Sequence, residues 1–179
     1  MALMVAVAPP LGQLSNAVLS SRIHDDLKLG GDAFGLVDTA WPAAGMLGAA
    51  LMPLGLTRLD CATALYFVPA IAGAATVALG LGQSVASLAA ADAVMAFSVW
   101  LCHIMIVSRV MAAAGTDNIG RADVGIHLVM SGSAAVMCLY PALLQQSLSG
   151  DYPVAWGLLV LLVSVAVGVR ALRQLTLES

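Results

Sequence analysis

The chain has 179 residues, of which 61% are hydrophobic and only 9% are charged, and its mean hydropathy is +0.97. A soluble domain of this size could hardly bury so much apolar surface, so we expect an integral membrane protein in contact with the lipid bilayer. The net charge is −3, and the absence of any basic run or phosphate-binding glycine loop excludes nucleic acid as a partner.

Six apolar segments of the sequence are each long enough to cross about 30 Å of hydrocarbon as a helix. We expect these spans at residues 2–23, 33–56, 61–82, 85–111, 122–146 and 152–169. The sequence therefore predicts an all-α membrane protein in which residues 1–179 form a single domain of six transmembrane helices.

The first two spans each combine helix-bending prolines with polar side chains. Pro9 and Pro10 should kink the first span, because neither has an N–H to donate. Gln13 and Asn16 follow at helical spacing, and they either contact a substrate or pack against a neighbouring helix. In the second span, Asp38 belongs either to a polar site or to the outer end of its own helix, which it would cap.

The fourth span is the most informative because it places two ionisable residues, Asp92 and His103, at membrane depth. An ionisable side chain at the bilayer centre costs about 3 kcal/mol, so such residues usually face a protein interior or a wet cavity. At about 100° per residue, one face of this helix carries a stripe of five residues: Asp92, Met95, Val99, His103 and Ile106. We expect this inner stripe to line the interior, with Asp92 either a proton or cation site or a structural hydrogen-bonding group.

A second histidine, His127, lies near the start of the fifth span, at the same end of the bundle as His103. Two histidines that face each other across helices can relay protons or ligate a haem or a chlorophyll; alternatively, each is simply hydrogen-bonded within the bundle. We expect no cofactor in the first instance and keep haem or chlorophyll near His103 and His127 as the alternative. No metal-ligand motif or nucleophile elbow is present, so we expect neither a metal site nor catalytic residues, and the chain is not predicted to be an enzyme.

The basic residues are divided unequally between the two ends of a six-span bundle. Two of them, Arg22 and Lys28, lie on one side. Five lie on the side shared by both termini: Arg58, Arg109, Arg121, Arg170 and Arg173. The positive-inside rule therefore places both termini in the cytoplasm, as in a multi-pass protein of a bacterial inner membrane.

Polar residues are concentrated in four of the six spans. The first, second, fourth and fifth carry the amide, acidic and histidine side chains described above, whereas the third and sixth are nearly bare of polar groups. We therefore expect the third and sixth spans to face lipid and the other four to lie inside.

Two stretches of the sequence resemble the major facilitator superfamily of transporters. DDLKLGGDAFGLVDTAWPAAGMLGAALMPLGLTRLD, from Asp25 to Asp60, is similar to that family's first outer loop, second helix and following short link. GRADVGIHLVMSGSAAVMCLYPALL, from Gly120 to Leu144, is similar to its entry into the fifth or eleventh helix. The link after the second helix retains few of the family's motif residues, which favours a resemblance to the carboxyl-terminal six-helix half.

This resemblance implies a half bundle whose first and fourth helices line a cavity, with the second and fifth beside it and the third and sixth outside. It also implies transport of a small-molecule substrate by alternating access against a second six-helix half, which a homodimer or a heteromer would supply. The candidate residues for substrate binding or proton coupling are Asp92, which is preferred, and Asp38, His103, His127, Gln13 and Asn16. The alternative hypothesis is a non-transporting accessory or assembly subunit of a larger membrane complex, such as a pigment–protein complex.

Overall fold

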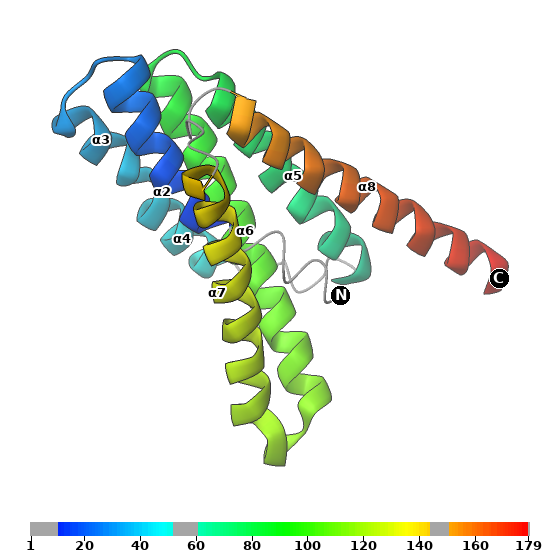
Figure 1. The fold of residues 1–179 in the computed structure, drawn as a ribbon. Helices are drawn as coiled ribbons and strands as arrows, with labels where there is room; N and C mark the ends of the chain where they lie inside the picture. The colour runs from blue at the N-terminus through cyan, green and yellow to red at the C-terminus, as the bar shows by residue number, and fades with distance from the viewer. Residues whose placement is uncertain (1–10, 52–60, 144–150, 179) are drawn as a thin grey trace.

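The computed structural model describes residues 11–51, 61–143 and 151–178, and these residues form helices with no strand among them (Figure 1). The all-α prediction is thereby confirmed for the described part of the chain. In chain order the elements are α2 (Leu11–Ser21), the π-helical turn η1 (Arg22–Asp26), α3 (Gly31–Asp38), α4 (Ala40–Leu51), α5 (Cys61–Leu81), α6 (Val85–Ala114), the 3₁₀ turn η4 (Thr116–Asn118), α7 (Ile119–Leu143) and α8 (Asp151–Glu178).

Helix α6 is the centre of the bundle, and α2, α3, α4, α5 and α7 all contact it. It begins at Val85, as predicted, because Ser84 and Ser87 form a capping box in which each hydroxyl accepts a hydrogen bond from the other residue's main-chain N–H. It continues beyond the predicted end at Met111 and stops before Gly115, whose φ of +67° is a conformation that favours glycine.

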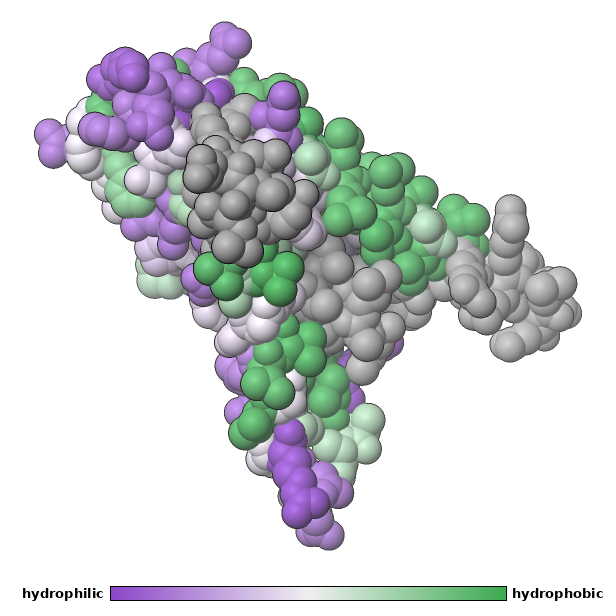
Figure 2. Space-filling view, viewed as in Figure 1, coloured by the Kyte–Doolittle hydropathy of each residue, from purple (hydrophilic) through white to green (hydrophobic). Residues whose placement is uncertain are grey.

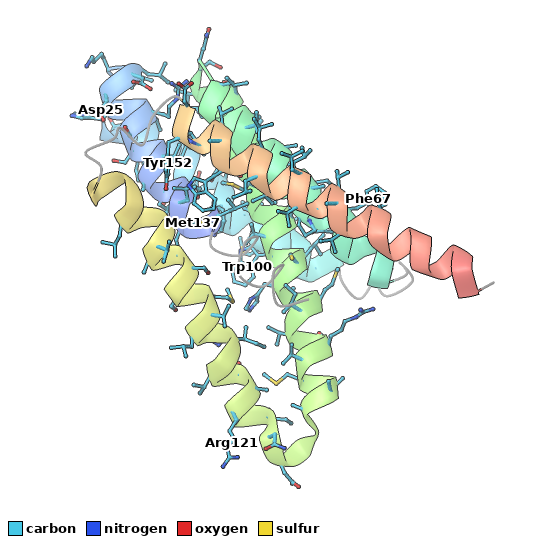
Figure 3. The ribbon with its side chains drawn as sticks, turned by 45° about the vertical axis from the view of Figure 1, so that its right-hand side comes forward. Asp25, Phe67, Trp100, Arg121, Met137 and Tyr152 are labelled. Atoms are coloured by element: carbon cyan, nitrogen blue, oxygen red, sulfur yellow. The ribbon has the colours of Figure 1, made fainter. Side chains whose placement is uncertain are left out.

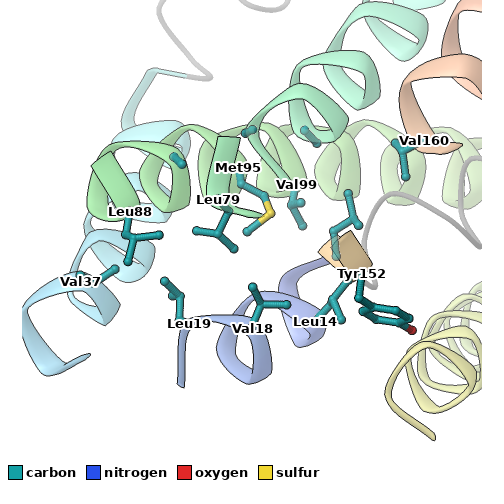
Figure 4. Packing of buried hydrophobic residues seen from close by; sticks show 14 of the residues in the cluster. Leu14, Val18, Leu19, Val37, Leu79, Leu88, Met95, Val99, Tyr152 and Val160 are labelled. Carbon is teal, nitrogen blue, oxygen red and sulfur yellow. The ribbon is translucent and has the colours of Figure 1, made fainter. Parts of the chain in front are cut away.

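The inner stripe of α6 faces the interior of the bundle, as the helical spacing predicted. Asp92, Met95, Val99 and Ile106 are buried, and His103 is half-buried. Figure 4 shows Met95 and Val99 packed in the main core, which α2, α3, α5, α6 and α8 all supply with side chains. Helix α6 therefore holds its one acidic side chain on the same face as its core residues.

The second span, predicted as one helix over residues 33–56, is divided at Thr39 into α3 and α4. The cause is Pro42, which has no N–H and so cannot bond to the carbonyl of Asp38 four residues earlier. The backbone at Thr39 keeps helical angles (φ −63°, ψ −21°), so the interruption is a lost hydrogen bond rather than an unwound segment. The predicted end of this span and the link that carries Arg58 lie outside the described residues.

The described part of the first span extends beyond its predicted end at Ile23. Helix α2 runs into the π-helical turn η1, where Arg22 forms an ion pair with Asp26 at 2.6 Å. The Arg22 guanidinium also donates a hydrogen bond to the carbonyl of Gly82, in the turn between α5 and α6. This arginine therefore fixes the end of the first helix to a distant turn; the predicted kink at Pro9 and Pro10 lies outside the described residues.

Among the described helices, α5 and α8 form the most extensive pair, and they run antiparallel. Their backbones come close because glycines lie at the crossing: a Cβ added to Gly73 would be 2.7 Å from the carbonyl oxygen of Gly157. Gly80 lies equally close to Val154. Helix α8 was predicted over residues 152–169 and continues to Glu178.

Helix α7 has few contacts with the other described helices, and Figure 3 shows it diverging from α6 away from their connecting turn near Arg121. It starts at Ile119 rather than at residue 122, and its predicted end past Leu143 lies outside the described residues. Tyr152 of α8 donates a hydrogen bond of 2.6 Å to the carbonyl of Met137. Large apolar side chains remain exposed along α7: Val124, Leu128, Val129, Val136 and Leu139.

Two of the described helices are long and apolar enough to cross a membrane, namely α6 over its whole length and α8 over Asp151–Val169. Only 22% of the apolar window of α8 is buried, so most of that surface is open. Figure 2 shows hydrophilic residues gathered at the upper left and at the lower tip of the molecule, and hydrophobic surface over α5 and α8 on the right. Exposed apolar surface on a long helix is what contact with hydrocarbon requires.

Candidate functional site

Asp92 is the only acidic side chain of the described residues that is fully buried, with 0% exposure. It lies two turns into α6 on the inner stripe, where Leu88 and Met95 share its face of the helix. Neither carboxylate oxygen accepts a hydrogen bond from any described residue. Because almost all buried polar groups in proteins are hydrogen-bonded, an unpartnered carboxylate marks this position as unusual.

Two polar side chains from other helices lie close enough to interact with Asp92: Ser15 of α2 and Asp38 of α3. Ser15 is itself buried, with 1% exposure, and its hydroxyl donates to the carbonyl of Gly12 at 3.0 Å rather than to Asp92. Asp38 is half-buried at the carboxyl end of α3. We call Asp92, Ser15 and Asp38 together the Asp92 site.

The chemistry of the Asp92 site follows from its lack of donors. A buried carboxylate without hydrogen bonds or a cationic partner costs several kcal/mol, and a second carboxylate nearby adds repulsion. Among the described residues, no lysine, arginine or histidine pairs with either aspartate. Such a site is stabilised by taking up a proton or a cation, which is the property that ion coupling requires.

The two histidines lie close together between α6 and α7, where we placed both at the same end of the bundle. Their ring centroids are 6.3 Å apart with planes at 76°, and the ring of Trp100 lies 6.2 Å from His103 in a similar edge-on arrangement. Nδ1 of His127 lies 3.0 Å from the carbonyl oxygen of Asp123 and 3.5 Å from its carboxylate. His127 therefore has a partner on its own helix, and His103 is held mainly by ring contacts.

Within the described ranges, no group of three or more histidine, cysteine, aspartate or glutamate side chains is arranged to hold a metal ion. Two imidazoles are enough to ligate a haem iron axially, so the pair of His103 and His127 retains the donor types that such a group uses. The structure brings these donors together but gives them no third ligand.

Gln13 and Asn16 lie on the outward face of α2, where both side chains are exposed. The structure therefore does not bring them to Asp92, and the buried polar residue of this helix is Ser15. The sequence contains a signal for Ser15 that we did not use: it interrupts the apolar stripe of Leu11, Leu14, Val18 and Leu19, all of which are buried.

The chain matches no protein-family model, no curated protein and no solved structure.

Proposed function

We propose that this chain is a half-size secondary transporter of the major facilitator type, embedded in the membrane by six helices and working with a second six-helix half. The second half is another copy of the chain or a similar chain. Together the two halves would enclose a small-molecule substrate and expose it alternately to the two sides of the membrane.

The helices differ in what they present, and this difference supports the proposal: some expose apolar side chains, and others meet at polar residues. Helices α2, α5, α6, α7 and α8, with α3 and α4 as one interrupted rod, overlap the sequence ranges of the six predicted spans. The third and sixth of these, α5 and α8, pack against each other and expose apolar residues such as Phe67, Ile71 and Leu162. The first and fourth, α2 and α6, meet at Ser15 and Asp92, where the resemblance expects a transport cavity.

The observation that carries the proposal is the carboxylate of Asp92, which is buried and has no hydrogen-bond partner among the described residues. A group this costly contributes nothing to stability where it stands, so its presence is best explained by binding and releasing an ion during a transport cycle. Gln13 and Asn16, on the exposed face of α2, are then available to the substrate or to the second half. The distribution of arginines places both termini on the cytoplasmic side.

Uptake into proteoliposomes tests the transport function directly. The full chain would be reconstituted and supplied with a panel of labelled sugars, amino acids and short peptides, under a proton gradient and separately under a sodium gradient. We expect gradient-driven accumulation of at least one solute and its loss in Asp92→Asn. The matched control is Asp32→Asn, an exposed aspartate at the start of α3. Unchanged accumulation in Asp92→Asn would contradict the assignment.

A second function is favoured by α7, whose apolar side chains are widely exposed and whose contacts with the bundle are few. In this alternative, the chain is a non-transporting subunit that packs α7 against a larger membrane complex and supports its assembly. The pair of His103 and His127 would then contact pigment. An absorption spectrum of the gently purified protein separates the two functions, because bound haem or chlorophyll gives a strong visible band and a simple transporter gives none.

A further inference from the structure

The polar side-chain atoms of the Asp92 site are oxygens from three different helices. Neither carboxylate oxygen of Asp92 has a hydrogen-bond partner within bonding geometry among the described residues. The Ser15 hydroxyl donates its hydrogen bond to the carbonyl of Gly12. Asp38 adds a carboxylate, which only accepts hydrogen bonds when ionised. A set of oxygens without donors is the surrounding that a hard cation prefers.

The interrupted helix adds to the negative field at this site. Pro42 has no N–H to give to the Asp38 carbonyl, so this one carbonyl lacks its helical hydrogen bond while the backbone at Thr39 keeps helical angles. A carbonyl oxygen without its helical partner carries a partial negative charge and adds to that of the Asp38 carboxylate.

The described basic residues do not supply the missing positive charge. Arg22 is bound to Asp26 and to the carbonyl of Gly82, and Lys28 is exposed in the turn before α3. His103 lies three turns further along α6, beside Trp100 and His127. No described basic side chain therefore compensates the charge of an ionised Asp92.

We propose that the Asp92 site binds Na⁺, with Asp92 and Ser15 as direct oxygen ligands and Asp38 supplying charge from the end of α3. A sodium ion can contact several of these oxygens at once, whereas a single proton satisfies one. Divalent ions fit less well, because Ca²⁺ takes six to eight oxygens and Mg²⁺ keeps an octahedral shell that includes waters. A role of Na⁺ as the coupling ion rests on the transport function proposed above. The binding of Na⁺ at the Asp92 site does not depend on that function.

Thermal unfolding of the full chain in detergent micelles tests the binding. The midpoint would be followed by tryptophan fluorescence while NaCl replaces choline chloride at constant total salt and constant pH. A ligand that binds only the folded state raises this midpoint progressively with its concentration. We expect Na⁺ to raise the midpoint, with no response to choline, and we expect the response to be absent in Asp92→Asn and preserved in the control Asp32→Asn.

A second variant keeps the test decisive if Asp92→Asn does not fold. Ser15→Ala removes one oxygen ligand without adding volume, and we expect it to raise the half-saturating Na⁺ concentration about fivefold, as for one lost polar contact. No sodium response in the wild type, or an unchanged half-saturating concentration in Ser15→Ala, overturns the site.

The transport function and the sodium site fail in distinguishable ways. Solute accumulation under a proton gradient, together with no thermal response to Na⁺, refutes the sodium site and leaves the transporter. A saturable response to Na⁺ that depends on Asp92, with no solute flux under either gradient, refutes the transporter and leaves the site.

Discussion

The pair of α5 and α8 differs sharply from the neighbouring contact of α2 and α3 with α6. In the first, glycines bring two backbones together, and the interface contains main-chain and apolar atoms. In the second, Asp38 and Ser15 lie near Asp92, and the buried carboxylate of Asp92 has no hydrogen-bond partner among the described residues. The packing of α5 against α8 therefore stabilises the fold, whereas the buried carboxylate between α2, α3 and α6 destabilises it. A loss of stability of this kind is expected at a binding site whose polar groups have no partner until the ligand binds.

The largest expected effect belongs to the α5–α8 side. Gly157→Leu places a side chain where the carbonyl oxygen of Gly73 lies 2.6 Å from the first added carbon, so the helices must separate. We expect a loss of about 3 kcal/mol in the free energy of unfolding, or failure to fold. The matched control is Gly125→Leu in α7, which meets no atom within 4 Å. Equal unfolding midpoints in the two variants would show that close packing is not what holds α5 to α8.

A substitution at Asp92 is expected to raise the free energy of unfolding. Asp92→Leu replaces an unpartnered carboxylate by an apolar side chain in a core position, and we expect a gain of about 2 kcal/mol in the free energy of unfolding, measured in choline chloride without sodium. The variant should be more stable and transport nothing. A Leu variant less stable than the wild type would mean that Asp92 is a structural group, and the comparison between the two regions would then fail.

The smallest effect is expected at the link between α7 and α8. Tyr152→Phe removes the hydroxyl that donates to the carbonyl of Met137 at 2.6 Å, and we expect a cost of about 1 kcal/mol. Hydrogen exchange should increase in α7 near Met137 more than in α5, because α7 has few other contacts. Ser164→Ala, which removes a hydroxyl bonded within α8, is the control. Faster exchange throughout the bundle would contradict a local role for this link.

Much of the helical architecture was predictable, because helix starts and buried faces depend on how residues are spaced along the sequence. The start of α6 at Val85 and its buried stripe follow from a serine cap and from 3.6-residue periodicity. The ends of α6 and α8 were placed too early, since hydropathy marks the apolar part of a helix and not where its hydrogen bonds stop. The division at Thr39 was missed because a proline can bend a helix or interrupt it, and tertiary packing decides which.

The candidate site was only partly predictable. Asp92 was identified from its cost in an apolar helix, and the approach of His103 to His127 followed from two antiparallel neighbours. Ser15 was missed because the polar residues of the first span were chosen by their helical spacing, which selected the exposed residues Gln13 and Asn16. A serine isolated among buried leucines carries more information, because it is polar where the core requires an apolar residue.

The most direct test of the proposed half transporter is the mass of the native particle after gentle solubilisation, followed by denaturation to identify its chains. We expect two six-helix chains, either twice the 18.2 kDa mass of this chain or this chain with one similar partner. A particle that contains this chain among many unrelated subunits would contradict the proposal and favour the accessory role.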